Sequence, residues 1–113
     1  MPRISYELPR DGKKIQTERD AVDLIGEAAS AGADIIIVPV ERLHDDFFQL
    51  KTRTAGEIAQ KFVQYRRRLV ILGDISRYVA ESSAFAAFVQ EANQGADIWF
   101  VTDIEELAAR LPL

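Results

Sequence analysis

The sequence has 113 residues, a common length for one domain, and its 48% hydrophobic and 28% charged content is typical of a globular protein. The absence of cysteine excludes disulfides, thiolate metal sites and cysteine nucleophiles. The formal net charge of −4 argues against a nucleic-acid binder. No segment has the roughly 20 apolar residues that span a bilayer, or the apolar core of a signal peptide, so we expect a cytoplasmic protein.

A small hairpin is predicted at the start of the chain. Ile4, Tyr6 and Leu8 alternate with polar residues, as in a half-buried strand. Residues 9–12 contain proline and glycine and are typical of a tight turn. A short strand around Ile15 would then pair back with the first strand.

Apolar residues at helical spacing predict several helices. They cover residues 17–31, residues 54–67, a segment that begins at Ser82 or Ser83, and a short segment after Asp103. Thr17 and Asp20 have the spacing of a capping box, and Asp103 and Glu106 have the same spacing. These pairs mark where two of the helices should begin.

Unbroken apolar runs lie between the helices, at residues 35–38, 69–72 and 98–101, and are typical of interior strands. Because helices alternate with these runs, neighbouring strands should be parallel and joined by right-handed crossovers. We therefore predict one α/β domain over residues 1–113. Its sheet should be open and mostly parallel or mixed, with roughly four to five strands and about four helices.

No residue pattern indicates catalysis or metal binding. His44 is the only histidine, and a histidine in a polar loop before two aspartates is more often solvated than a metal ligand. The glycines are isolated, without the spacing of a nucleotide-binding loop. Residues 66–68 are three arginines, which at the end of a helix offset its dipole. We expect no enzymatic activity, no metal and no cofactor.

The end of the strand at 69–72 is one candidate site. Gly73, Asp74 and Ser76 follow this strand, and ligands of open α/β sheets bind beyond the carboxyl ends of the strands. The alternative role for Asp74 is an Asx turn with Ser76. Both interpretations are open from the sequence.

The start of helix 54–67 is the other candidate site. Thr54 and Glu57 have capping-box spacing, yet Gly56 in the same turn costs about 1 kcal/mol relative to alanine. This glycine suggests the close approach of another backbone or of a partner surface. Helix starts also attract anions, so Thr52 and Thr54 are either candidate phosphoacceptors or ordinary caps.

The segment "DDFFQLKTRTAGEIAQKFVQYRRRLVILGDIS" resembles a bacterial family, domain-of-unknown-function family 4180 (DUF4180), as do "DAVDLIGEA" and "FVQEANQGADIWFV". The resemblance runs from about residue 14 to the C-terminus. The residues that match are Phe47, Phe48, Leu50, Thr52, Ala55, Gly56, Glu57, Gln60, Lys61, Phe62, Tyr65, Arg66, Gly73 and Asp74. Membership of this family implies no particular activity.

A more distant resemblance concerns the architecture. The order of apolar strand, connection, Ser/Thr-Gly helix start and apolar strand is similar to the STAS domain of anti-sigma-factor antagonists (SpoIIAA-like). Those domains switch partner binding through a phosphorylatable serine or threonine at that helix start, where this chain has Thr52 and Thr54 in "TRTAG". The aspartate-serine pair of those domains is absent here, and the preceding loop is longer. The resemblance implies a STAS-like fold and phosphoregulated partner binding.

The first functional hypothesis is a non-catalytic protein-binding or regulatory module, with another protein or a second copy of the chain as partner and no nucleic acid or membrane involved. Its surface would comprise Phe47, Phe48, Thr52, Thr54, Gly56, Glu57, Lys61, Gly73, Asp74 and Ser76. The alternative is a small-molecule or nucleotide-binding protein with a strand-end pocket around Asp74, Glu57 and Lys61. A domain that serves mainly to dimerise is a third hypothesis.

Overall fold

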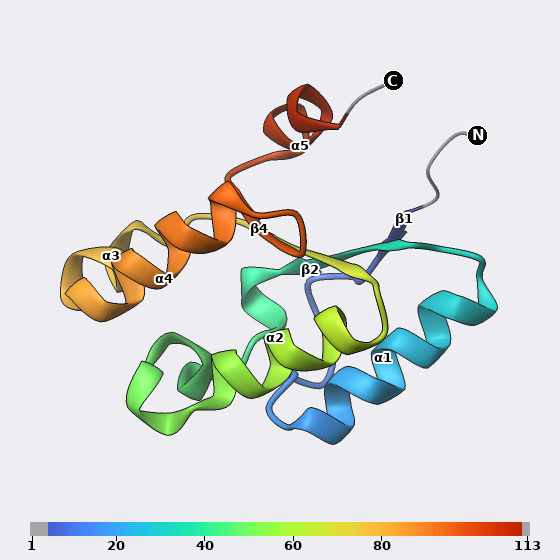
Figure 1. Cartoon of the computed structure of the whole chain (residues 1–113), viewed down its shortest axis with the longest axis horizontal. Coiled ribbons are helices and arrows are strands. Elements are labelled where there is room, and N and C mark those ends of the chain that lie inside the picture. Colours follow the sequence, from blue (N-terminus) through green and yellow to red (C-terminus); the bar gives the residue numbers. More distant parts are fainter. Residues whose placement is uncertain (1–4, 112–113) are drawn as a thin grey trace.

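One sheet of four parallel strands forms the centre of the computed structural model, which describes residues 5–111 (Figure 1). The strands are β1 (Ser5–Glu7), β2 (Ile35–Pro39), β3 (Arg68–Leu72) and β4 (Ile98–Val101). They lie side by side in chain order, with Leu69 opposite Ile36 on one side and Ile98 on the other. The predicted α/β class is confirmed. Ile4, the first residue of the predicted N-terminal strand, lies outside the described residues.

Helices and short 3₁₀ turns connect the strands. The α-helices within residues 5–111 are α1 (Glu18–Ser30), α2 (Thr54–Gln64), α3 (Ser76–Glu81), α4 (Ser83–Gln94) and α5 (Ile104–Arg110). The 3₁₀ turns η1 (Val40–Arg42), η2 (Asp45–Phe48) and η3 (Leu50–Thr52) follow one another in the connection from β2 to α2. All four predicted helices are present, and α3 was not predicted. No helix in this range is long and apolar enough to cross a membrane.

The two faces of the sheet are covered unequally. Ile36, Leu69 and Phe100 point into a large core with residues of α1, α2 and α4, whereas Ile37 and Val70 point to a smaller cluster that includes Leu107 of α5. The strands are ordered as in the chain, and crossovers between parallel strands share one hand. The helices that connect successive strands therefore lie on the same face of the sheet. Figure 1 shows α1 and α2 on one side of the strands and α5 on the other.

Side-chain caps begin three of the helices. Thr17 and Asp20 form the predicted capping box, with the Asp20 amide donating to Thr17 Oγ1 at 3.1 Å and the Thr17 amide donating to Asp20 Oδ2 at 3.0 Å. Ser82 caps α4 by accepting from the Phe85 amide, and Asp103 Oδ1 caps α5 by accepting from the Glu106 amide at 2.8 Å. The predicted starts of these helices are confirmed.

The predicted N-terminal hairpin is wrong. β1 pairs with β2 in parallel, and Ile15 forms an isolated parallel bridge with Leu43. The guanidinium group of Arg42 holds the turn between them, because it donates to the carbonyl oxygens of Lys13, Pro9 and Asp11 at 2.9, 3.0 and 3.1 Å. The chain therefore turns toward η1 instead of folding back onto β1.

Helix α2 ends three residues before the predicted boundary. Arg66 has φ 56°, and the Arg67 amide donates to the Phe62 carbonyl at 2.9 Å, which closes the helix in a Schellman arrangement. Arginine takes the left-handed position that glycine usually takes, so the sequence carried no stop signal there.

Candidate functional site

The start of α2 is not built as predicted. Arg53 is the N-cap residue and has a left-handed backbone with φ 66°, and no side chain caps the helix. Thr54 is the first helical residue, and the Glu57 amide donates to the Arg53 carbonyl at 2.9 Å. A capping box needs an extended N-cap with a short polar side chain, so the Thr54–Glu57 pair does not form one.

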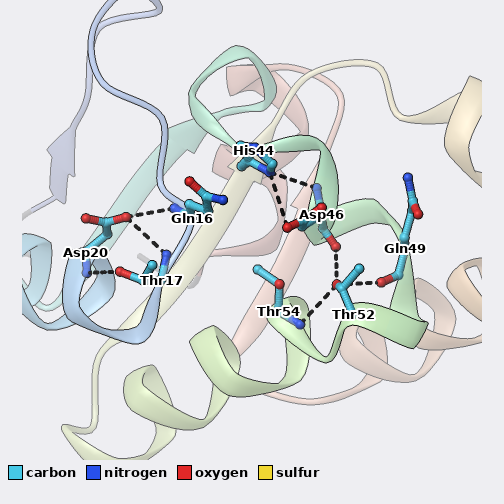
Figure 2. A network of polar contacts seen from close by, with 8 residues as sticks. All are labelled: Gln16, Thr17, Asp20, His44, Asp46, Gln49, Thr52 and Thr54. Carbon is cyan, nitrogen blue, oxygen red and sulfur yellow. Dashed lines mark hydrogen bonds and ion pairs between the residues drawn. The ribbon is translucent and has the colours of Figure 1, made fainter.

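Thr52 braces the turn before α2 (Figure 2). Its hydroxyl lies 2.6 Å from the Asp46 carbonyl and 2.7 Å from the Gln49 carbonyl, and it accepts from the Thr54 amide at 3.3 Å. His44 supports the same turn, because its Nδ1 accepts from the Asp46 amide at 3.1 Å. The Thr54 hydroxyl makes no hydrogen bond within the described residues, so Thr54 is the freer of the two candidate phosphoacceptors.

The two phenylalanines of the connection belong to the core. Phe47 is fully buried, and Phe48 is 4% exposed and stacks on Tyr78 of α3 with 3.8 Å between ring centroids. Phe47 therefore cannot form part of a partner surface as predicted. Phe48 contributes only one edge to a hollow described below.

At the end of β3, the backbone uses both Gly73 and Asp74. Gly73 has φ 142°, and a Cβ at this position would lie 2.8 Å from Cγ2 of Val40. Asp74 Oδ1 accepts from the Ser76 amide at 2.9 Å, in the Asx turn that opens α3. Hydrogen bonds from the Ser76 hydroxyl and amide lower the pKa of the Asp74 carboxyl group. Asp74 and Ser76 thus have a structural role.

Gly56 shows the opposite environment from the one predicted. Apart from its chain neighbours and the backbone of α2 itself, no atom of the described chain lies within 4 Å of the Cβ that another residue would place there. The expected approach of another segment of the same chain is therefore wrong, and the remaining expectation for Gly56 is a partner surface.

Gly56 opens into a groove between α2 and α4. The groove consists of two neighbouring hollows of about 550 and 300 Å³ that share Phe88. Gly56, Ala59, Gln60 and Val63 of α2 and Phe88, Glu91 and Ala92 of α4 line this α2–α4 groove. Within the described residues, α1 packs along α2 and α3 along α4, whereas α2 and α4 are in only marginal contact.

The rim of the α2–α4 groove near α1 carries charged residues. Lys61 Nζ lies 3.6 Å from Glu18 Oε2, and Glu57 stands beside the same carboxyl group. A hydrogen bond with Glu18, burial and the negative charge of Glu18 raise the pKa of Glu57, while the positive charge of Arg53 lowers it. Two carboxyl groups of like charge therefore stand together at an open surface.

A separate hollow lies beyond the carboxyl ends of the strands. It has a volume of about 500 Å³ and is lined by residues of η2, η3 and α3, including Asp45, Phe48, Lys51, Arg77 and Tyr78. The predicted strand-end pocket does not form around Asp74. Glu57 and Lys61 line the α2–α4 groove, and Asp74 lines neither that groove nor this separate hollow. Leu50 borders both this hollow and the α2–α4 groove.

Sequence reasoning missed the α4 side of the groove. Phe88 and Ala92 have helical spacing with Phe85, yet only Phe85 of this helix is fully buried, and the other two pack against the core while partly exposed. The available signal is the width of the apolar face, since α4 has the sequence SAFAAFVQEANQ, with more apolar residues than one buried stripe requires.

Comparison with protein families identifies the chain. No curated protein and no solved structure gives a significant match, so the similarity to the STAS domain is not confirmed. The sequence model of one family, described as "Domain of unknown function (DUF4180)", matches residues 3–111. The chain belongs to the DUF4180 family.

Proposed function

We propose that this chain is a non-catalytic protein-binding module of the bacterial cytoplasm and that its partner binds in the α2–α4 groove. Both helices direct more apolar side chains toward the groove than the core covers. Phe88, Ala92 and Ala59 are half-buried, and Val63 is 43% exposed. A partner that covered these groups would bury apolar surface that the folded chain leaves in contact with water.

Gly56 is the observation that carries the proposal. Glycine inside a helix costs about 1 kcal/mol relative to alanine, and the open space at Gly56 means that no contact within the chain requires it. A side chain at this position would project into the groove. Glycine keeps this part of the groove open, which a binding role explains.

Gly26 of α1 provides a matched control. It is also an exposed helical glycine with no atom within 4 Å of a built Cβ, but it does not line the groove. Gly56→Arg and Gly26→Arg each add the same side chain to an exposed helix. Only the first fills the proposed site.

Site-specific photo-cross-linking tests the proposal. A photoreactive residue in place of Gln60, which is exposed and lines the groove, should yield a discrete cross-linked protein partner in bacterial cells. The same residue at Ser30, exposed on α1, should yield none. Gly56→Arg should remove the Gln60 adduct and Gly26→Arg should leave it. An adduct that both glycine variants retain would refute binding in the groove.

A second candidate function is small-molecule binding in the hollow beyond the carboxyl ends of the strands. The supporting observation is its place, since open α/β sheets bind ligands at this edge, and its volume of about 500 Å³, which suits a small ligand. A thermal-shift screen of metabolites and nucleotides should then give hits that Arg77→Ala abolishes. A screen without hits, or hits that Arg77→Ala leaves unchanged, would refute this candidate.

A further inference from the structure

We infer that the occupant of the α2–α4 groove is a basic, amphipathic α-helix of a partner protein. The inference rests on the proposed function and specifies its partner. It follows from three properties of the groove. They are the backbone hydrogen bonding of the helices that form its walls, the spacing of its small residues and the sign of the charge that has no ion pair.

The walls of the groove are helices, and this favours a helical rather than an extended backbone for the occupant. Beyond the first turn of α2, whose initial amides have no partner inside the helix, the backbone groups of α2 and α4 are bonded within each helix, and the parallel pairing of β2, β3 and β4 lies beneath them. An extended peptide would find no free strand edge in the groove, so its own amides and carbonyls would lose water without gaining partners. A helix satisfies these groups internally.

The residues along α2 match the ridges of a docked helix. Gly56, Ala59 and Val63 stand at positions i, i+3 and i+7, the spacing at which one helix faces another. Small residues at the first two positions let a second backbone come close, and Phe88 and Ala92 supply the opposite wall at i and i+4. The occupant should therefore present apolar anchors at i, i+3 or i+4, and i+7, over about two turns.

The charges around the groove favour a basic occupant. The two hollows are lined by the carboxylates Glu18, Glu57, Glu91 and Asp97 and by the cations Arg53 and Lys61. Lys61 pairs with Glu18, and Arg53 stands near Glu57. At the other end of the groove, Val63 and Asp97 also border a neighbouring hollow lined by the three arginines of residues 66–68, which compensate Asp97. Glu91 has no ion pair within the described residues, and α4 contains no basic residue.

A second copy of this chain fits these charges poorly. Helix α1 carries Glu18, Asp20, Asp23 and Glu27 against the single cation Arg19, and α5 carries Glu105 and Glu106 against Arg110. Either helix would bring further negative charge to Glu57 and Glu91. Like charges across an interface disfavour association, so neither of these two helices of a second copy suits the groove, and we take a different protein as its occupant.

Selection from an unbiased library tests the inference. A displayed library of peptides of about 18 residues, random in charge and in helix propensity, is selected against the full chain and then counter-selected against Gly56→Arg. We expect the surviving peptides to be rich in lysine and arginine, to contain no proline and to carry the apolar spacing given above. In titrations, Gly56→Arg should weaken them at least about tenfold and Gly26→Arg by less than about twofold.

The charge requirement has its own readout. Glu91→Lys reverses the charge of the uncompensated carboxylate and should weaken the selected peptides by about two- to fivefold at low salt, with the effect reduced at high salt. Gln90→Lys, exposed on the same helix but absent from the groove lining, is the control. Equal effects of the two variants would overturn the choice of a basic partner.

The outcomes separate this inference from the proposed function. Peptides that depend on Gly56 but are acidic or extended would overturn the basic helix and leave protein binding in the groove intact. Concentration-dependent dimers that Gly56→Arg abolishes in sedimentation experiments would identify the second copy and overturn the inference in the same way. Failure to select any peptide that Gly56→Arg weakens would refute both.

Discussion

Two glycine–carboxylate pairs, Gly73–Asp74 and Gly56–Glu57, are used by the fold in opposite ways. At the end of β3, Val40 would collide with any Cβ at position 73, and Ser76 bonds the Asp74 carboxylate. At the start of α2, the space beside Gly56 is empty, and Glu57 faces the like charge of Glu18. The first pair is explained by the fold alone. The second lacks such an explanation and lies in the α2–α4 groove, and for these two reasons together we propose a partner there.

The largest effect is expected at Gly73. Gly73→Ala should lower the free energy of unfolding by about 2–4 kcal/mol, because it adds a collision with Val40 to a backbone conformation that L side chains rarely adopt. Denaturant unfolding measures this value. Gly32→Ala is the control, since Gly32 also has positive φ but open space around it, so only the backbone strain of about 1 kcal/mol should appear. Equal losses at both positions would show that contact with Val40 is unimportant.

A smaller loss is expected at Thr52. Thr52→Val keeps the shape of the side chain but removes the hydroxyl that bonds the turn, so the free energy of unfolding should fall by about 1–2 kcal/mol. Thr54→Val should change it by less than about 0.5 kcal/mol, because the Thr54 hydroxyl has no bond to lose within the described residues. A larger loss at Thr54 than at Thr52 would contradict the structure of this turn.

A gain in stability is expected at Gly56. Gly56→Ala should raise the free energy of unfolding by about 0.5–1 kcal/mol, because alanine restricts the unfolded chain and its Cβ meets no other segment of the described chain. Gly26→Ala should give a similar gain in α1. A loss at Gly56 with a gain at Gly26 would mean that the fold requires Gly56 after all.

The smallest expected effect is on the pH dependence of stability, to which Asp74 and Glu57 should contribute with opposite sign. The pKa of Asp74 is lowered by folding, so its contribution to stability is present above its unfolded pKa and is lost as the pH falls through the folded value. The pKa of Glu57 is raised, so its contribution is present at low pH and is lost as the pH rises above about 4.5.

Unfolding free energies measured from acidic to neutral pH test these signs. Asp74→Asn should reduce the loss of stability toward acid, and Glu57→Gln should reduce the loss toward neutral pH. The same sign for both variants would contradict the assigned surroundings of one of them.

The sequence predicts the elements of this fold better than their contacts. The apolar runs around Ile36, Val70 and Phe100 predict the strands, and Thr17, Ser82 and Asp103 mark helix starts, because these signals are local. The first turn could not be predicted, since Arg42 holds it from about 30 positions away along the chain. Helix α3 was missed because six residues after an Asx turn carry almost no periodic signal.

The candidate site was predictable only in part. Gly56 is unusual in a helix from its sequence position alone, and Glu57 and Lys61 do line the groove beside it. The sequence does not show the φ angle of Gly73 or the space around Gly56. A close approach was therefore expected at Gly56, whereas the structure has it at Gly73. Phe88 and Ala92 have the spacing of a buried stripe, and they remain partly exposed because α2 and α4 do not pack closely together.

The most direct test of binding in the groove is to measure stability and partner cross-linking together in Gly56→Arg and Gly26→Arg. We expect both variants to be at least as stable as the natural chain, because each replaces a helical glycine at a position with open space around the added Cβ, and we expect only Gly56→Arg to lose the adduct formed at position 60. An adduct of undiminished yield in a folded Gly56→Arg protein would contradict the account.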